Sequence, residues 1–379
     1  MNKFQYSFRE YFLVFILLLV VLTSRPWSLG ELFTPVSLSL AVISLFCYSF
    51  ISTVWNEPWW KIVAIITLMT ALLMLLSPTT SLKIKAQNLF ITGVYFTFFS
   101  FLMGNRSTVV LFSKALVAFL LCMAVSNVIT FFLYTNGLVK NPLIYIENWS
   151  KTYEYVPFAI YYPFSNVIGT YYLSGSFFDG VSALRLTSFL REPGLSSIIL
   201  SFITYWLLTT YPENRKTIVF LVLAGMLCVS TAYLPSVLLA IFFALVVKYK
   251  RLINIPASML IILLIVLSIA ILAIVFTPGV GLIDKSIAHQ SSVDDRISHL
   301  FGVRLSFSGD NFINSLVFLL TLIKYIMLYF VSKNKKTSLG LVLLYLSGLH
   351  NDFHNSLTEA IFIGLLFVPV KNVEQCRVL

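Results

Sequence analysis

The sequence predicts an all-α polytopic membrane protein, with about twelve transmembrane helices in a single integral-membrane domain over residues 1–379. Three observations carry this prediction. Hydrophobic residues make up 59% of the chain and charged residues 11%, against roughly 45–50% and 25% in soluble domains. The apolar residues fall into runs close to the ~20 residues that a spanning helix needs. Water-soluble, collagen-like and disordered classes are therefore excluded.

Apolar runs, cut where charged residues or clusters of Pro and Gly interrupt them, define twelve predicted helices. They lie near residues 8–24, 32–54, 61–77, 87–103, 111–134, 194–211, 217–232, 235–247, 257–276, 311–331, 337–349 and 355–370. The first run is not followed by a good small-residue cleavage site, so we expect it to be retained. The four cysteines offer neither a disulfide framework nor a CxxC metal motif.

The distribution of Lys and Arg predicts the orientation of the chain. With the N-terminus in the cytoplasm, fifteen of these residues fall on the inner side and three in short outer loops, as expected of cytoplasmic loops. Both termini are then cytoplasmic, and two long periplasmic loops, about 135–193 and 277–310, lie on the outer side. Long loops are usually functional, so we expect the outer face to be the working face.

The first candidate site precedes the predicted sixth helix, in Arg185-Leu-Thr-Ser-Phe-Leu-Arg191-Glu192-Pro193-Gly194. A plain helix start explains Glu192 and Pro193, because an acid suits the helix dipole there and Pro is tolerated in the first turn. It does not explain Arg191, since a cation opposes the dipole at that end. Two guanidinium groups beside a helix N-terminus suit a phosphate or pyrophosphate, with Glu192 available as a general base.

The two long loops carry further candidates. Residues 294–310 hold several charges, which surface ion pairs explain without a ligand; in the sharper alternative, Arg296 is another phosphate-binding residue. The first loop is dense in aromatic residues, which an aromatic belt at the membrane interface explains, with stacking on sugar rings as the alternative. These residues are Tyr145, Trp149, Tyr153, Tyr155, Tyr161, Tyr162, Tyr171, Tyr172, Phe177 and Phe178.

The last candidate site is the polar turn before the final predicted helix. Two rows at i, i+4 spacing run from it into the helix: His350, His354 and Thr358, and Asn351, Asn355 and Glu359. A hydrogen-bonded stripe at the membrane interface explains it without a ligand.

In the functional alternative, His350, Asn351, Asp352, Asn355 and Glu359 line a sugar-binding cavity, and His354 is a second candidate for the base. Glu359 lies about one turn into the helix, where an ionisable group is costly and by default functional. No metal is predicted, because the His and Asp residues lack a fixed ligand spacing. Lys324 is expected to snorkel toward the inner end of its helix and is given no role.

About twelve predicted helices, two large outward segments, an Arg-Glu-Pro-Gly element at 191–194 and a His-Asn-rich turn before the last helix together resemble the bacterial O-antigen polymerase and ligase superfamily. The closest resemblance is to O-antigen polymerases, which join lipid-linked oligosaccharide repeats on the periplasmic side of the inner membrane. Over the whole chain the resemblance lies in the arrangement of helices and loops, and over about 185–359 it also includes short motifs. It implies a metal-independent, cofactor-free glycosyltransferase whose arginines, here Arg185, Arg191 and Arg296, hold the undecaprenyl pyrophosphate of the donor.

Such a polymerase needs a polar cavity for sugars, cations for the leaving pyrophosphate and a base for the acceptor hydroxyl. Glu192 is the first choice for that base and His354 the second. The expected partners are the lipid-linked substrate, the membrane and a chain-length regulator protein, with no nucleic acid because membrane orientation accounts for most of the net charge of +11. The alternatives are a ligase of the same superfamily and, from a non-enzyme class, a flippase or transporter.

Overall fold

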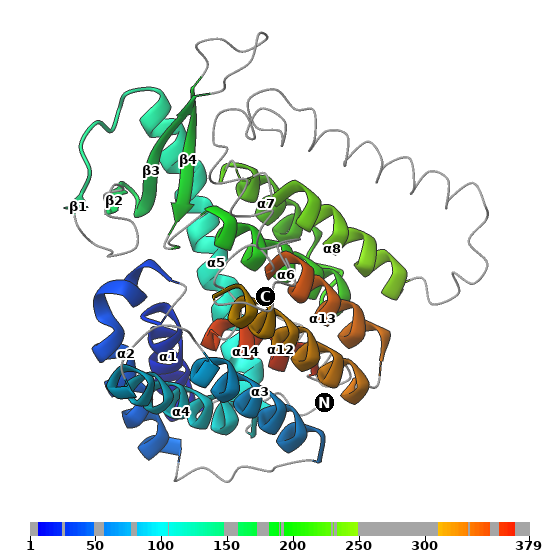
Figure 1. Ribbon diagram of the computed structural model, residues 1–379. Helices are drawn as coiled ribbons and strands as arrows, with labels where there is room; N and C mark the ends of the chain where they lie inside the picture. The colour runs from blue at the N-terminus through cyan, green and yellow to red at the C-terminus, as the bar shows by residue number, and fades with distance from the viewer. Residues whose placement is uncertain are drawn as a thin grey trace. The chain divides into compact units, whose positions relative to one another are not determined.

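The described part of the chain is mainly helical and contains a small antiparallel sheet (Figure 1). The computed structural model describes residues 7–24, 27–48, 57–76, 82–104, 106–147, 158–172, 182–188, 190, 193–228, 230, 233–248, 310–332, 334–348 and 356–367. Its helices are α1 Phe8–Leu22, α2 Ser28–Tyr48, α3 Glu57–Leu76, α4 Leu82–Gly104, α5 Arg106–Thr135, α6 Pro193–Thr210, α7 Arg215–Met226, α8 Tyr233–Lys248, α12 Asp310–Val331, α13 Lys335–Gly348 and α14 Leu357–Phe367. The strands are β1 Ile144–Ile146, β2 Phe158–Tyr161, β3 Ser165–Tyr172 and β4 Ser182–Ser188.

The prediction of about twelve transmembrane helices with two long outer loops is wrong. Eleven helices of the described residues begin and end close to the predicted runs, but by length and composition two stretches in this part of the chain qualify as membrane spans, Lys85–Gly104 and Ser107–Thr135. Six other apolar stretches have 10–17 residues. An apolar run shows only that a helix avoids water, and one this short is typical of a helix buried in a protein core.

The predicted outer loop 135–193 is also corrected, because it contains the four strands of the sheet. The predicted helix 257–276 and residues 277–309 of the second loop lie outside the described residues, as do both chain ends.

The chain divides into two compact units. The first comprises residues 1–119, 302–345 and 352–379, and the second comprises residues 120–301 and 346–351. In the first unit, α2 packs against α1 and α4, and α3 packs against α4 and α12, while α14 packs against α4. In the second unit, α6 packs against α7, α8 and β4.

Local sequence signals explain how the helices of the first unit begin, bend and meet. A capping box starts α1, in which the Ser7 hydroxyl accepts from the Glu10 amide and the Glu10 carboxylate accepts from the Ser7 amide. The backbone of α2 leaves helical geometry at Phe33, two residues before Pro35, because a proline inside a helix clashes with the preceding turn. Ser37 of α2 donates to the Val20 carbonyl of α1 at 3.0 Å, which ties the two helices together.

The sheet of the second unit is an antiparallel meander in the order β1-β2-β3-β4. The chain reaches it from α5, which ends at Thr135 and is followed by Gly137 with a φ of 68°, a left-handed conformation that glycine adopts without strain. Val167 of β3 and Leu186 of β4 are buried and pack against Phe131 of α5. The sheet is therefore anchored to the last turns of α5.

Candidate functional site

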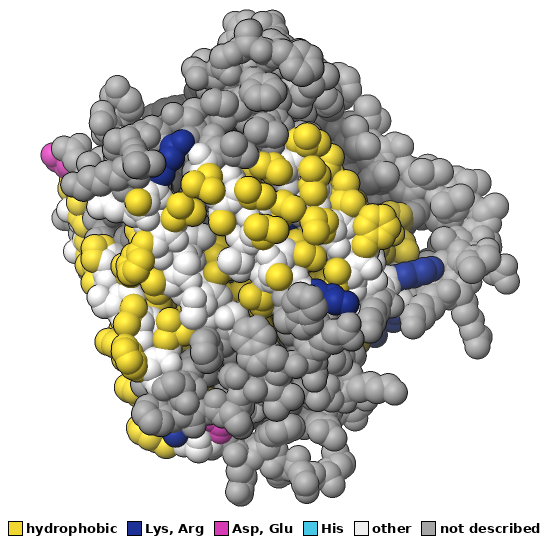
Figure 2. Space-filling view, turned by 60° about the horizontal axis from the view of Figure 1, so that its bottom comes forward, with side chains coloured by type: hydrophobic (Ala, Val, Ile, Leu, Met, Phe, Trp, Pro, Cys, Tyr) yellow, Lys and Arg dark blue, Asp and Glu magenta, His cyan; other side chains and the backbone are white. Residues whose placement is uncertain are grey.

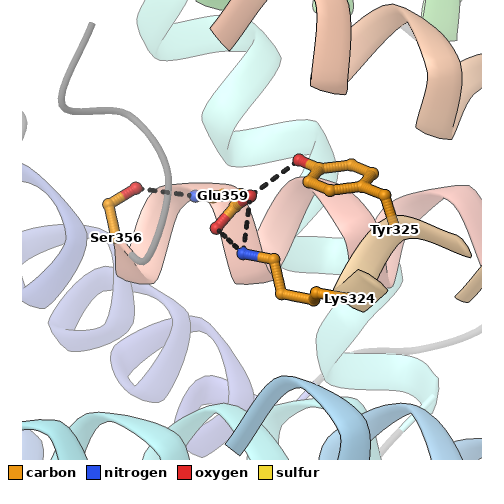
Figure 3. A network of polar contacts seen from close by, with 4 residues as sticks. All are labelled: Lys324, Tyr325, Ser356 and Glu359. Atoms are coloured by element: carbon orange, nitrogen blue, oxygen red, sulfur yellow. Dashed lines mark hydrogen bonds and ion pairs between the residues drawn. The ribbon is translucent and has the colours of Figure 1, made fainter. Parts of the chain in front are cut away.

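A buried ion pair joins α12 to α14 in the first unit (Figure 3). Lys324 Nζ lies 2.8 Å from Glu359 Oε2 and 3.0 Å from Glu359 Oε1. The Tyr325 hydroxyl donates to Glu359 Oε1 at 2.6 Å. The side chains of Lys324 and Glu359 are 0% and 2% exposed, so the charges of both residues are removed from water.

The first turn of α14 is held by contacts from several parts of the first unit. The Glu359 amide donates to the Ser356 hydroxyl at 3.0 Å, an N-cap interaction that satisfies one free amide of the helix start. Trp27, which precedes α2, donates from Nε1 to the Thr358 hydroxyl at 3.1 Å. Ser356, Thr358 and Glu359 lie one to four positions after residue 355, so these contacts fix the start of α14.

Lys324 and Glu359 stabilise each other because both are buried. An isolated charge in an apolar interior costs several kcal/mol, and a partner with good geometry offsets most of that cost. A carboxylate near a helix N-terminus also interacts favourably with the helix dipole. Glu359 of α14 is thus a structural anchor in this arrangement, and its carboxylate has a direct cation partner within the protein.

The ring of Tyr325 also lines an apolar groove between α12 and α13. The groove has a volume of about 300 Å³, and its lining includes Leu322, Tyr329, Leu341 and Tyr345. The Tyr325 and Tyr345 rings lie 5.3 Å apart at their centroids. One tyrosine therefore contacts the groove with its ring and the ion pair with its hydroxyl.

The predicted role of Lys324 needs correction. Its ammonium group does not snorkel to the end of α12 but is fully buried against Glu359. One usable signal for this pair is present in the sequence, since Lys324 and Glu359 are ionisable residues well inside predicted apolar helices, where such groups commonly pair with each other. Whether Glu359 also contacts a substrate stays a prediction.

The second predicted site lies at the junction of β4 and α6. Arg185 stands in β4 opposite Gly169 of β3, and α6 begins at Pro193. The Ser196 hydroxyl of α6 lies 3.4 Å from the Thr187 carbonyl of β4, and both residues are buried. The strand end and the start of this 18-residue helix are therefore held together. In the sequence, Arg191 and Glu192 directly precede the helix.

The remaining predicted site residues lie outside the described residues, so their roles stay predictions. They are Arg191, Glu192, Arg296, His350, Asn351, Asp352, His354 and Asn355. For Arg185, the structure gives the position of the backbone in β4 but not that of the side chain.

A row of polar side chains on α5, which was not predicted from the sequence, holds the turn between β2 and β3. Ser126 donates to the Pro163 carbonyl at 2.7 Å, and Thr130 donates to the Tyr162 carbonyl at 3.0 Å. The Ser165 hydroxyl hydrogen-bonds the Asn127 side chain. The signal that could have found this row is the i, i+4 spacing of Ser126 and Thr130 within an otherwise apolar run, which places both on one helix face.

Comparisons with protein-family models, with curated proteins and with solved structures found no match to this chain.

Proposed function

We propose that this protein is a bacterial inner-membrane glycosyltransferase that polymerises lipid-linked oligosaccharide repeat units on the periplasmic face, making O-antigen or a related surface polysaccharide. The observation that carries the proposal is the junction of β4 and α6, where Arg185, Arg191 and Glu192 lie within eight sequence positions of one another, at the start of α6.

The β4–α6 junction combines three features that favour a pyrophosphate. The N-terminus of α6 carries the positive end of the helix dipole, which favours an anion. The guanidinium groups of Arg185 and Arg191 match phosphate oxygens through paired hydrogen bonds. The buried contact of Ser196 with the Thr187 carbonyl keeps the strand end against the helix start. Arg185 therefore belongs to the anchored strand, and Arg191 belongs to the short connection that follows it.

Apolar faces on helices of both units support residence in a membrane. Large hydrophobic side chains are exposed at helical spacing on α1 and on α3 in the first unit and on α5 in the second. These residues are Phe8, Tyr11, Phe12 and Phe15, then Leu68, Leu72 and Leu75, then Val125, Ile129 and Phe132. On the face drawn in Figure 2, hydrophobic side chains are widespread among the described residues and charged ones stand singly. Soluble monomers rarely expose large contiguous apolar patches, whereas lipid contact explains them.

The proposed reaction transfers a glycosyl group from one lipid-linked chain to another. An acceptor hydroxyl attacks the anomeric carbon of the donor sugar, and the bond from that carbon to the pyrophosphate oxygen breaks with its electron pair leaving on the pyrophosphate. Arg185, Arg191 and Arg296 stabilise the charge that develops there. Glu192, or His354 in its place, accepts the proton of the acceptor hydroxyl.

The decisive experiment is the lipopolysaccharide banding pattern of a strain that lacks this chain, with and without the chain supplied from a plasmid. Polymerase activity predicts that a ladder collapses to a single-repeat band and returns on complementation. Complete loss of capped lipopolysaccharide would instead indicate a ligase. In a second arm, purified protein with a lipid-linked repeat should form longer oligosaccharides, which neither a ligase without its acceptor nor a transporter would do.

One observation favours a second candidate function, a transporter or flippase of lipid-linked oligosaccharides. Transporters commonly place ionisable residues inside the membrane, where these pair with each other, and Lys324 and Glu359 form such a pair between two apolar helices. Accumulation of unpolymerised lipid-linked repeats on the cytoplasmic side of the deletion strain would favour this function over the polymerase.

A further inference from the structure

Helix α5 has two contrasting faces over its last fourteen residues. Its outward face carries Cys122, Val125, Ile129 and Phe132, which are exposed and recur at the three- and four-residue spacing of one helix face. Its other face carries the buried residues Ser126, Asn127 and Thr130. The stretch Ser107–Thr135 is a candidate membrane span, so the outward row suits lipid and the buried row suits protein contacts.

The buried face of α5 binds the turn that joins β2 to β3. Ser126 and Thr130 donate to the carbonyls of Pro163 and Tyr162 in this turn, and the Asn127 side chain hydrogen-bonds Ser165, the first residue of β3. Thr130 and Ser126 lie five and nine residues before the end of the helix at Thr135. At 1.5 Å per residue, these contacts lie about 8 and about 14 Å from that end.

Those depths begin at the boundary between lipid headgroups and hydrocarbon and extend into the hydrocarbon. The 29 residues of the candidate span correspond to about 43 Å of helix, close to the full thickness of a bilayer with its headgroups, of which the hydrocarbon is about 30 Å. The headgroup layer at each end is therefore about 6–7 Å deep. Residues held about 8 to 14 Å from the end of α5 therefore lie between this boundary and about 7 Å inside the hydrocarbon.

The chemistry of the turn suits that depth. Backbone carbonyls at membrane depth need hydrogen-bond partners from the protein, and α5 supplies them to Tyr162 and Pro163. Tyr162 and Phe164 themselves are 54% and 56% exposed. Phe164 has a φ of 80°, which is unfavourable for a bulky residue, so the chain keeps a large apolar ring where glycine or asparagine would cost less.

We infer that the turn Tyr162-Pro163-Phe164 inserts into the membrane beside α5, with Tyr162 near the boundary between headgroups and hydrocarbon and Phe164 deeper, in the hydrocarbon. The partner is the lipid bilayer itself, and the inference rests on the proposed membrane residence. Tyr162 is the aromatic type that favours the headgroup level, and the turn carries no charge. Lys140 and Glu147, exposed on either side of β1, belong on the aqueous side in this arrangement.

Depth measurements with nitroxide labels test the inference. The full chain, with cysteines other than the probed one replaced by alanine, is reconstituted in vesicles of phosphatidylcholine and phosphatidylglycerol. Labels are placed at Tyr162→Cys, Phe164→Cys and Lys140→Cys, and at native Cys122 as the control within the helix. We expect oxygen to reach labels 122, 162 and 164 better than a water-soluble nickel complex does, with 164 deeper than 162. Label 140 should show the opposite preference.

The pattern of label accessibility distinguishes insertion of the turn from residence of the protein in the membrane. Nickel access at 162 and 164 with oxygen access at 122 would place the turn in water, as a sugar-stacking surface would require, and would overturn the inference while leaving membrane residence intact. Nickel access at 122 as well would overturn both.

Removing the hydroxyl groups of Ser126 and Thr130 provides an independent test of the inference. In Ser126→Ala/Thr130→Val the turn loses two partners for its carbonyls, so label 164 should move at least several-fold toward nickel access while label 122 stays unchanged. Ser113→Ala is the matched control, because the Ser113 hydroxyl bonds a carbonyl of its own helix, that of Val110. An unchanged label 164 in the double variant would contradict the inference that α5 holds the turn at this depth.

Discussion

Lys324 and Glu359 are 35 residues apart in the sequence, and their side chains meet with Nζ 2.8 Å from Oε2. The pair connects α12 to the first turn of α14, directly after the polar segment 350–355. Because both charges are buried, removing one partner is expected to cost more than removing both. The difference in stability between the single and the double variant therefore measures the interaction between Lys324 and Glu359.

Lys324→Met should destabilise the protein by about 3–5 kcal/mol, because it leaves the Glu359 carboxylate buried without its cation. Lys324→Met/Glu359→Met should recover a large part of that loss, since no charge then remains in the apolar interior. Thermal unfolding in detergent measures both variants. Lys335→Met, which removes an exposed lysine at the start of α13, should change stability by less than about 0.5 kcal/mol. A double variant no more stable than Lys324→Met would contradict the prediction.

The contact between α7 and α8 depends on the absence of a side chain at Gly225. A Cβ atom at this position would lie 2.2 Å from Tyr233 Cζ, and the Tyr233 hydroxyl is held by a 3.0 Å bond to the Val222 carbonyl. Gly225→Ala should therefore destabilise the protein by about 1–3 kcal/mol through overpacking.

Gly93→Ala is the matched control for this effect, since a methyl group at Gly93 of α4 would meet nothing within 4 Å. It should stabilise the helix by about 0.5–1 kcal/mol. Gly225→Ala/Tyr233→Ala should behave no worse than Tyr233→Ala alone. Equal melting temperatures for Gly225→Ala and Gly93→Ala would rule out the close contact.

Phe164→Gly should raise the melting temperature of the protein in detergent, because glycine adopts the φ of 80° without steric cost. The expected gain is about 1 kcal/mol, reduced by the greater freedom of glycine in the unfolded chain. Phe164→Ala serves as the comparison, since it removes the ring and keeps the strain. If both variants lower the melting temperature equally, the ring and not the backbone determines stability at this turn.

The sequence predicted the positions of the helices well, but it did not predict which helices are long and apolar enough to span a membrane. The reason is physical. Apolar runs such as Leu357–Phe367 have the same composition whether a helix is buried in protein or in lipid, and α14 is buried along most of its length. The strands were missed because the aromatic content of 135–193 was attributed to an interfacial loop. Its runs of aromatic and β-branched residues, Phe158–Tyr161 and Ser165–Tyr172, separated by three residues, also suit a hairpin.

The buried pair could be suspected from sequence but not located. Two opposite charges inside apolar helices commonly meet, yet the contact of Lys324 with Glu359 depends on how α12 and α14 are rotated against each other, which no local pattern specifies. The connection at Arg191 differs, because its position between β4 and α6 follows from the order of the chain alone.

Polymer formation should not require a divalent metal. Arginines can supply the positive charge that a metal would otherwise bring to pyrophosphate, and the His350, Asp352 and His354 group lacks a convincing ligand spacing. Purified protein with a lipid-linked repeat should therefore polymerise it equally well in excess chelator and in added magnesium. Loss of activity in chelator that one metal restores would revive a metal site at this group.

The final prediction concerns Arg191, which we expect to bind the pyrophosphate through two parallel hydrogen bonds at the start of α6. A guanidinium group matches phosphate geometry and an ammonium does not, so Arg191→Lys should keep the charge yet lose much of the activity. Arg191→Ala should lose nearly all of it. Removing a charge-assisted contact to the leaving group lowers turnover by roughly 10²–10³, as for an oxyanion donor.

Membrane abundance measured beside the banding pattern separates a role in the reaction from a role in folding. Arg191→Ala relieves a cation at a helix N-terminus, which leaves folding unharmed or slightly improved, and Arg191→Lys keeps the charge of the native residue. Both variants should therefore insert at normal levels while the polymer becomes short or absent. Arg215 provides a matched control, because it is an exposed arginine at the first residue of α7. Arg215→Lys and Arg215→Ala should leave the ladder at full length. A full-length ladder from well-expressed Arg191→Ala would remove Arg191 from the site and shift the pyrophosphate contact to Arg185 and Arg296.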